Sequence, residues 1–376
     1  MNARPNPSRT VGQSTAARSA AVQATVDEAL ELAPLIDGHN DWAWECRLNR
    51  GYSVDGLDGS LETDTDIHRL RAGRVGGQFW SVYVEDTLPG ADAVQGTLEQ
   101  IDWVYRLADR YPDTFQIATS AADVEAARAG GRIASLLGAE GAHCLNDSPG
   151  VLRMLARLGV RYLTLTHVHN TSWADSGTDE AVHGGLTDRG VEYIRELNRL
   201  GMLVDLSHVS PATAHAALDV TTAPVIFSHS SCSAVTAHPR NVPDEVLVRL
   251  ADNDGVLMVT FVPQFVSADY AEWFAGDRSA PAPAVTLGQV ADHIEHARSV
   301  AGVRHIGLGG DFDGTDEFPD QLDGVDGYPA LLAELARRGW SAAELAALAG
   351  ANVLRVLRAT DSAFAGSESG RTRLTR

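Results

Sequence analysis

The stretch "DGHND" (residues 37–41) ends an apolar run and places His39 two residues before Asp41. In a β-strand, side chains two residues apart project from the same face. A histidine beside a carboxylate at a strand end can hold a divalent metal ion. The same pair is also typical of a polar strand end with an aspartate helix cap. Residues elsewhere in the chain decide between these two interpretations.

Several other apolar runs end in the same residue types: Glu140, His167 with His169, His208, His229, and Asp311 with Asp313. Carboxylates crowded at one edge would repel one another and lose hydration unless a cation supplied the countercharge. Histidine and carboxylate ligands without cysteine suit Zn²⁺, Mn²⁺ or a similar ion. This many ligands fits two ions better than one, and Glu140, from a separate run, is the leading candidate for the carboxylate that bridges them.

The elements that carry these residues alternate between short apolar runs and helical patterns, which indicates βα units and a parallel sheet. We expect strands at 33–41, 75–84, 132–141, 161–170, 202–208, 224–229, 255–262 and 304–314. Eight such units predict an α/β fold, a (β/α)8 TIM barrel, with a C-terminal helical addition at about 328–358. In this fold the catalytic groups lie at the C-terminal ends of the strands, where the candidate residues fall.

The domain organisation follows from the same pattern. Residues 1–30 are expected to form a flexible or helical extension, residues 31–360 the metal-dependent TIM barrel, and residues 361–376 a flexible tail. "SP" at 210–211 predicts a helix start, with serine as the cap and proline at the first helical position.

Composition excludes several classes of function. A net charge of −20 argues against nucleic acid and anionic membranes as partners. The three cysteines (Cys46, Cys144 and Cys232) are far apart and odd in number, so a disulfide framework is not expected. Unpaired cysteines are typical of a reducing compartment, and we therefore expect a cytoplasmic location. The chain contains no lysine, which excludes Schiff-base chemistry, P-loop phosphate binding and a carboxylated lysine as the metal bridge.

The ordered motifs resemble those of the membrane (renal) dipeptidases, peptidase family M19, in their soluble bacterial branch among the amidohydrolase-like barrels. The matching stretches are "DGHND" (37–41), "GAEG" (138–141), "LTLTHVHNT" (163–171), "VDLSHVS" (204–210), "PVIFSHSSCSAV" (224–235), "RNVPDE" (240–245) and "GLGGDFDG" (307–314). They span roughly residues 33–358. The mammalian members carry a disulfide cysteine where this chain has His169.

The resemblance implies two zinc ions per chain. His39 and Asp41 would hold one ion and His208 and His229 the other, with Glu140 bridging them. Two such ions about 3.5 Å apart can share a hydroxide that is nucleophilic at neutral pH.

The resemblance also implies the roles of three further residues. His167 would contact the substrate carbonyl or the oxyanion, and Arg240 would bind the terminal carboxylate of the substrate. Asp311 would transfer the proton, although the spacing leaves Asp313 as a competitor. The remaining histidines, including His238, are expected to be structural or exposed, and His169 could still face the site.

These expectations describe a binuclear zinc dipeptidase whose substrates include L-Xaa-D-Xaa dipeptides. Two alternatives stay open: a hydrolase of N-acyl amino acids, lactones or β-lactams on the same barrel, and a metal-binding barrel without catalysis. The expected partner is a small dipeptide, and the family resemblance makes a homodimer plausible.

Overall fold

A computed structural model describes the backbone of residues 7–369 and the side chains of residues 18–366. Nine parallel strands form the sheet: β1 (Leu35–Asn40), β2 (Val75–Ser81), β3 (Phe115–Ile117), β4 (Ile133–Ala139), β5 (Val160–Thr164), β6 (Leu203–Asp205), β7 (Ile226–Ser230), β8 (Val256–Val259) and β9 (Ile306–Leu308). Every strand except β3 belongs to a closed ring. The ring closes because β2 pairs with β4 and β1 pairs with β9.

The expected (β/α)8 barrel is therefore confirmed, with one strand more than the sequence indicated. β3 lies outside the ring and pairs with the first half of β4, whereas β5 pairs only with the second half of β4. Its three residues are too short to show the alternation that marks a strand. The ring strands are also shorter than expected, and 304–314 contributes only Ile306–Leu308. Most candidate site residues therefore lie in the loops that follow the strands.

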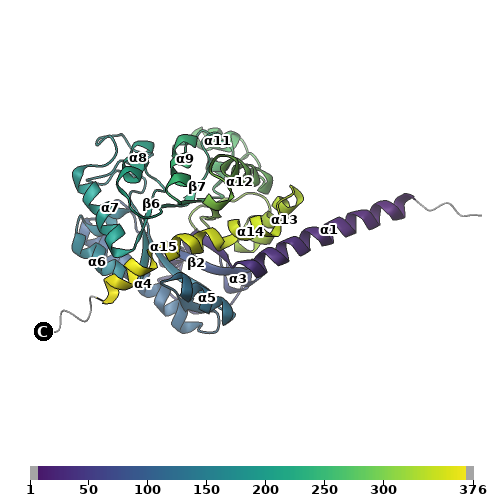
Figure 1. Cartoon of the computed structure of the whole chain (residues 1–376), viewed down its shortest axis with the longest axis horizontal. Coiled ribbons are helices and arrows are strands. Elements are labelled where there is room, and N and C mark those ends of the chain that lie inside the picture. The colour runs from purple at the N-terminus through teal and green to yellow at the C-terminus, as the bar shows by residue number, and fades with distance from the viewer. Residues whose placement is uncertain (1–6, 370–376) are drawn as a thin grey trace, which may run out of the picture.

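Helices connect the strands and cover the outside of the barrel (Figure 1). The longer ones between strands are α4 (Gly90–Arg110), α5 (Ala121–Ala129), α6 (Pro149–Arg157), α7 (Asp188–Leu200), α8 (Pro211–Val220), α9 (Asp244–Asp252) and α12 (Leu287–Ala301). Shorter helices lie in the loops after strands: α2 (Trp42–Arg50), α3 (Ile67–Ala72), α10 (Pro263–Val266) and α11 (Ala268–Ala275). The start of α8 is as expected, because the Ser210 side chain accepts the N–H of Thr213 and Pro211 takes the first position.

The C-terminal helical addition is also confirmed. It consists of α13 (Tyr328–Arg337), α14 (Ala342–Ala346), a π-helical turn (Ala347–Ala351) and α15 (Asn352–Ser369). α15 extends into the stretch 361–376 that was predicted as a tail, and residues 370–376 lie outside the described part. At the other end, α1 (Pro7–Leu32) runs away from the barrel and contacts it through α13 and α14 (Figure 1).

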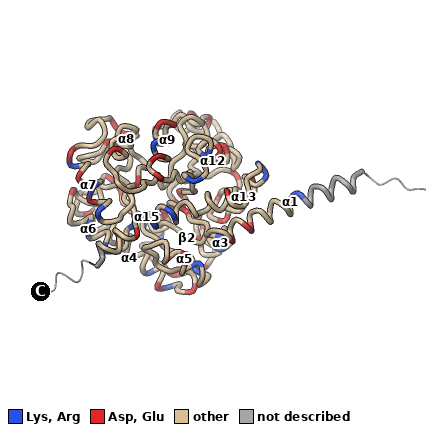
Figure 2. Tube along the Cα trace, viewed as in Figure 1, with Lys and Arg blue, Asp and Glu red and all other residues tan. Residues whose placement is uncertain are grey.

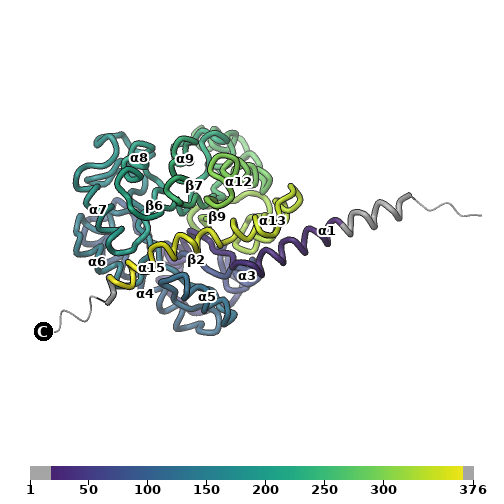
Figure 3. The backbone as a smooth tube through the Cα atoms, viewed as in Figure 1, coloured from purple at the N-terminus to yellow at the C-terminus, as the bar shows by residue number. Residues whose placement is uncertain are grey.

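α15 closes the end of the barrel opposite to the strand C-termini. Val353, Leu354 and Leu357 pack into one buried cluster with residues of the barrel interior, among them Ile36 and Phe79. Figure 3 shows α15 crossing in front of the strands in this view. Only the other end of the barrel is thus left for a site.

Acidic and basic residues are interspersed along the chain in the view of Figure 2. Within residues 7–369, every helix is too short or too polar to cross a membrane.

Candidate metal centre

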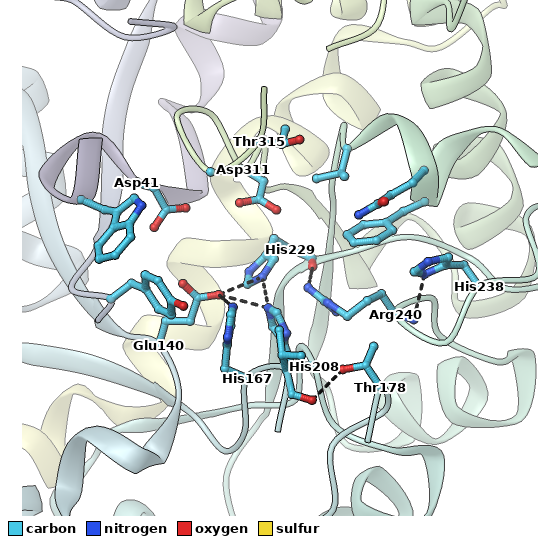
Figure 4. A pocket seen from close by; sticks show the side chains of 17 residues that line it. Asp41, Glu140, His167, Thr178, His208, His229, His238, Arg240, Asp311 and Thr315 are labelled. Carbon is cyan, nitrogen blue, oxygen red and sulfur yellow. Dashed lines mark hydrogen bonds and ion pairs between the residues drawn. The ribbon is translucent and has the colours of Figure 1, made fainter. Parts of the chain in front are cut away.

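All five expected metal ligands meet at the C-terminal end of the barrel. Figure 4 shows Asp41, Glu140, His208 and His229. Four of them lie on different strands or on the residues just after them: His39, Glu140, His208 and His229. Asp41 follows β1 directly and precedes α2. They are buried, with at most 8% of any of these residues exposed.

The two carboxylate oxygens of Glu140 face two different groups of ligands. Oε2 lies 3.2 Å from Nε2 of His39, which is also 3.2 Å from Oδ2 of Asp41. Oε1 lies 3.1 Å from Nε2 of His208 and 3.4 Å from Nε2 of His229. The Ser81 hydroxyl donates to Oε2 and holds the carboxylate between the two groups.

The backbone after the strands aims these side chains inward. His39 and His229 lie within strands β1 and β7, whose alternation points them to the site. His208 has a φ of 71° and Asp311 a φ of 67°, in the left-handed region that non-glycine residues seldom adopt. Such strain is concentrated at functional sites, where surrounding contacts over-determine the conformation.

Hydrogen bonds leave the Nε2 lone pair of His39 facing the site. The Tyr162 hydroxyl donates to the carbonyl of Gly38, so it accepts the Nδ1 proton of His39 across 2.9 Å. The ring of Tyr162 reaches this position over Gly138, where a Cβ atom would lie 1.9 Å from the ring. The first glycine of "GAEG" therefore allows an aromatic ring to approach the backbone closely.

A second chain of hydrogen bonds sets the same tautomer in His229. The Ser228 hydroxyl donates to Asp205 across 2.6 Å, so it accepts the Nδ1 proton of His229 across 2.8 Å. Asp205 also accepts the hydroxyl proton of Thr164 and the backbone N–H of Ser207. Partners of this kind, behind a ligand, orient it and raise its affinity for metal.

The electrostatic environment of the site shifts the pKa values of the histidine ligands in two directions. Burial by itself lowers the pKa of His39, but Tyr162, Glu140 and Asp41 together hold that pKa well above its usual range. Burial also depresses the pKa of His208 and of His229 well below the usual range, so both stay neutral. Neutral imidazoles are the form that binds metal.

The carboxylates respond to the same field. Burial and the neighbouring Asp41 and Glu140 raise the pKa of Asp311 to about 8. Burial would raise the pKa of Glu140 too, but His39, His208 and His229 outweigh burial and lower that pKa well below its usual range.

These residues fit a bound cation. Nε2 of His39 is buried, has no hydrogen-bond partner and lies 3.2 Å from a carboxylate oxygen of Asp41 and from one of Glu140. Nε2 of His208 and Nε2 of His229 lie only 2.9 Å apart, and both face Glu140. Lone pairs and carboxylates that converge in this way need a positive charge between them, and the donor set suits Zn²⁺ or a similar ion.

A cavity of about 550 Å³ opens over the centre. Its wall includes His167 and Arg240 and, unexpectedly, His238. The ring of His167 lies between Tyr83 and His208, with centroids at 4.6 and 4.5 Å, and its Nε2 is 4.0 Å from Glu140. His169 is largely exposed and is absent from the wall.

Arg240 brings a buried positive charge to the cavity. Its guanidinium donates to the carbonyl of His229 and the hydroxyl of Ser230, lies over the ring of Phe265, and leaves Nε without a partner. Burial lowers the pKa of Arg240 to about 10, so it remains charged at neutral pH. A buried cation with unused donors is suited to a carboxylate ligand.

The structure separates Asp311 from its competitor. Asp311 lines the cavity, and its Oδ1 lies 4.0 Å from Nε2 of His39. Asp313 turns away and accepts the backbone N–H of Asp64 across 2.8 Å, while Asp64 accepts the N–H of Asp313. The spacing of two residues alone did not distinguish them.

Several residues of the site were not predicted from the sequence. Tyr162, Ser228 and Asp205 support the ligands from behind, and Asp86 contacts His167. Asp86 had a signal, because it follows the expected strand 75–84 by two residues. The others lie inside apolar runs, where a hydroxyl or a carboxylate gives no sign of its partner.

Comparisons with known proteins agree with this geometry. The model of the membrane dipeptidase family (peptidase family M19) matches residues 23–369. An uncharacterised dipeptidase of Schizosaccharomyces pombe is 47% identical over 348 residues, which cover 87% of this chain and 81% of the yeast protein. The dipeptidase verJ of Clonostachys rogersoniana is 42% identical over 356 residues, covering 90% and 88%.

A solved structure has the same fold. The crystal structure of a metallopeptidase of family M19, dipeptidase AC, superposes with a TM-score of 0.78 at 26% identity, covering 87% of this chain and 98% of that one.

Proposed function

We propose that this chain, which belongs to the membrane dipeptidase family (peptidase family M19), is a binuclear zinc dipeptidase. The observation that carries the proposal is the placement of Glu140, with one oxygen toward His39 and the other toward His208 and His229. A carboxylate in this position can serve two ions at once. His39 and Asp41 would hold one ion, and His208 and His229 the other.

When bound, the two ions would activate water as a nucleophile and polarise the scissile carbonyl. The chain's own residues would do the rest. Arg240 would bind the C-terminal carboxylate of the substrate through its guanidinium. His167, beside Glu140, would contact the carbonyl oxygen as negative charge develops on it. Asp311 would accept the proton of the attacking water at its carboxylate and give it to the leaving amine.

The arrangement favours dipeptides over longer peptides. Arg240 and the metal centre line the same cavity, so a carboxylate held by Arg240 brings the adjacent peptide bond to the ligands. We infer that L-Xaa-D-Xaa dipeptides are among the substrates, because the cavity of about 550 Å³ leaves room around a dipeptide. A cytoplasmic location and a homodimer stay predictions; the three cysteines are buried and free, which is compatible with a reducing compartment.

The proposal is tested by metal content together with turnover. We expect about two zinc ions per chain, cleavage of L,L- and L,D-dipeptides, and no cleavage of the same dipeptides with C-terminal amides. N-acyl amino acids, lactones and β-lactams would be assayed in parallel. Two ions with turnover of these compounds alone would favour the alternative hydrolase, and two ions with no turnover of any substrate would favour a barrel without catalysis.

A substitution at Arg240 tests the carboxylate contact itself. Arg240→Lys keeps the charge but loses the two-pronged geometry, so kcat/KM for dipeptides should fall about 10- to 100-fold, mainly through KM. Arg249→Lys, at a surface pair with Asp219, is the matched control and should leave both constants unchanged. An unchanged KM in Arg240→Lys would remove Arg240 from the substrate site.

A further inference from the structure

Asp86 lies behind the cavity, where it joins the loop after β2 to the loop after β5. Its Oδ2 is 2.9 Å from Nδ1 of His169, 3.2 Å from the backbone N of His169 and 3.4 Å from Nδ1 of His167. The side chain is only 11% exposed and is absent from the cavity wall. Asp86 therefore touches a residue of the site without being positioned to touch the substrate.

His167 has few other restraints on its ring. Nδ1 is buried and has no hydrogen-bond partner, and the carboxylate of Asp86 lies 3.4 Å from it, within ion-pair distance. The opposite nitrogen, Nε2, faces Glu140. Tyr83 and His208 lie on the two sides of the ring, and they restrict its tilt without distinguishing a ring nitrogen from the ring carbon across from it. A ring rotation of half a turn would put Cδ2 in the place of Nδ1 and Cε1 in the place of Nε2.

We propose that Asp86 is the positioning residue of His167: its carboxylate keeps a proton on Nδ1 and thereby keeps Nε2 directed at the cavity. A carboxylate that accepts from one ring nitrogen fixes both the tautomer and the orientation of the imidazole. His169 holds Asp86 in place through its ring and its backbone N–H. The exposed His169 thus acts two contacts away from the substrate.

Glu85, the acidic residue next to Asp86 in the chain, has different contacts. Glu85 pairs with Arg47 across 2.7 Å, and none of its described contacts reaches His167. It is consequently a matched control, because its removal takes one carboxylate and one ion pair from the same loop.

This inference rests on the proposed function for its activity readout. Asp86→Ala should lower kcat about 10- to 100-fold on dipeptides, with a smaller change in KM and an unchanged zinc content. Asp86→Asn keeps the shape and an acceptor for the N–H of His169, so its loss should be smaller; it also covers the case in which Asp86→Ala does not fold. Glu85→Ala should keep the kcat of the wild type.

A double-mutant cycle separates positioning from a general tether between loops. If Asp86 acts through His167, Asp86→Ala should cost almost nothing in a chain that already carries His167→Ala. An equal loss of kcat in both backgrounds would overturn the proposal, and so would a wild-type kcat in Asp86→Ala.

Nitrogen NMR of the ¹⁵N-histidine-labelled full chain tests Asp86 without any substrate. The signals of His167, assigned by their loss in His167→Ala, should show a protonated Nδ1 in the wild type and a changed tautomer in Asp86→Ala, which removes the acceptor. Unchanged signals in Asp86→Ala would overturn the proposal. A wild-type protein that cleaves no dipeptide would count against the proposed function, and the NMR result would still decide the role of Asp86.

Discussion

At the scale of residues, the site depends on which nitrogen or oxygen each side chain turns to the centre. His39 and His229 each donate a hydrogen bond from Nδ1 to a hydroxyl oxygen, so Nε2 is the ring nitrogen that faces the centre. Asp311 lines the cavity, and burial together with Asp41 and Glu140 raises its pKa to about 8. A group of this kind can exchange protons with a substrate.

Asp311→Asn should therefore lower kcat about 10²- to 10⁴-fold, the usual contribution of a general acid or base, while zinc stays bound. The measurement is kcat and zinc content of the same preparation. Asp313→Asn is the matched control, since Asp313 faces Asp64 instead of the cavity, and its kcat should stay near that of the wild type. Equal losses in the two variants would contradict the assignment of Asp311.

At the scale of elements, neighbouring strands support the ligands from behind. β4 and β5 pair so that Gly138 lies opposite Tyr162, which lets the ring cross the strand to His39. β6 and β7 join through Asp205 and Ser228, which together orient His229. The register of the sheet thus sets the tautomers of the ligands.

Gly138→Ala should displace the ring of Tyr162, because the new Cβ would lie 1.9 Å from it. Loss of the partner behind His39 should weaken zinc binding about 10- to 100-fold, as measured by competition with a chelator. Tyr162→Phe removes only the hydroxyl and should give a similar loss. In Gly77→Ala of β2 the atom nearest to the new Cβ would be Cγ1 of Ile36, at 3.3 Å, so this variant should bind zinc nearly as the wild type does.

The packing of α12 on the end of β7 depends on a neutral histidine. His293 accepts the N–H of Cys232 at Nδ1 and lies 3.1 Å from the carbonyl of Val266 at Nε2, where it can donate. Burial lowers the pKa of His293 to about 4, with the Val266 carbonyl and Asp292 opposing and His296 reinforcing this shift. A proton added at Nδ1 would place N–H against N–H.

The sign of the pH dependence follows from the lowered pKa. His293 contributes stability above its unfolded pKa of about 6.5, and this contribution is lost as the pH falls from about 6.5 toward 4, by about 3 kcal/mol at most. His293→Asn should be less stable at pH 7.5 but should lose less stability than the wild type between pH 6.5 and 5. Urea unfolding of the metal-free proteins measures this; parallel pH curves would contradict it.

At the scale of the whole molecule, the barrel gathers three carboxylates at one end and closes the other with α15. Asp41, Glu140 and Asp311 lie close together, and burial keeps the neighbouring His208 and His229 neutral. Repulsion between these carboxylates therefore destabilises the folded chain, and a bound metal ion would relieve it. Stability and metal binding should be linked.

Removal of metal by a chelator should lower the free energy of unfolding by roughly 4 kcal/mol when the metal had been present at about 1,000 times its dissociation constant. The Tm should fall by several degrees and recover when zinc is added back. Glu140→Gln, which removes the bridging charge, should show a much smaller response. A wild-type Tm that does not change although zinc is lost would contradict the linkage.

The sequence by itself determined the chemistry and the order of the elements. The pattern of apolar runs that end in His39, Glu140, His208 and His229 predicted both the barrel and its metal centre, because side-chain alternation and strand-end residues are local properties of the chain. The absence of lysine likewise left a glutamate as the candidate bridge.

Only the tertiary structure decided which atoms meet. The register of β4 with β5, the left-handed turns at His208 and Asp311, and the contact of Asp86 with His167 join residues far apart in the sequence. No local pattern encodes these distances, because they depend on how the closed ring sets the twist and spacing of all its strands. For this reason the choice of Asp311 over Asp313 and the place of His238 in the cavity wall could be read only from the folded chain.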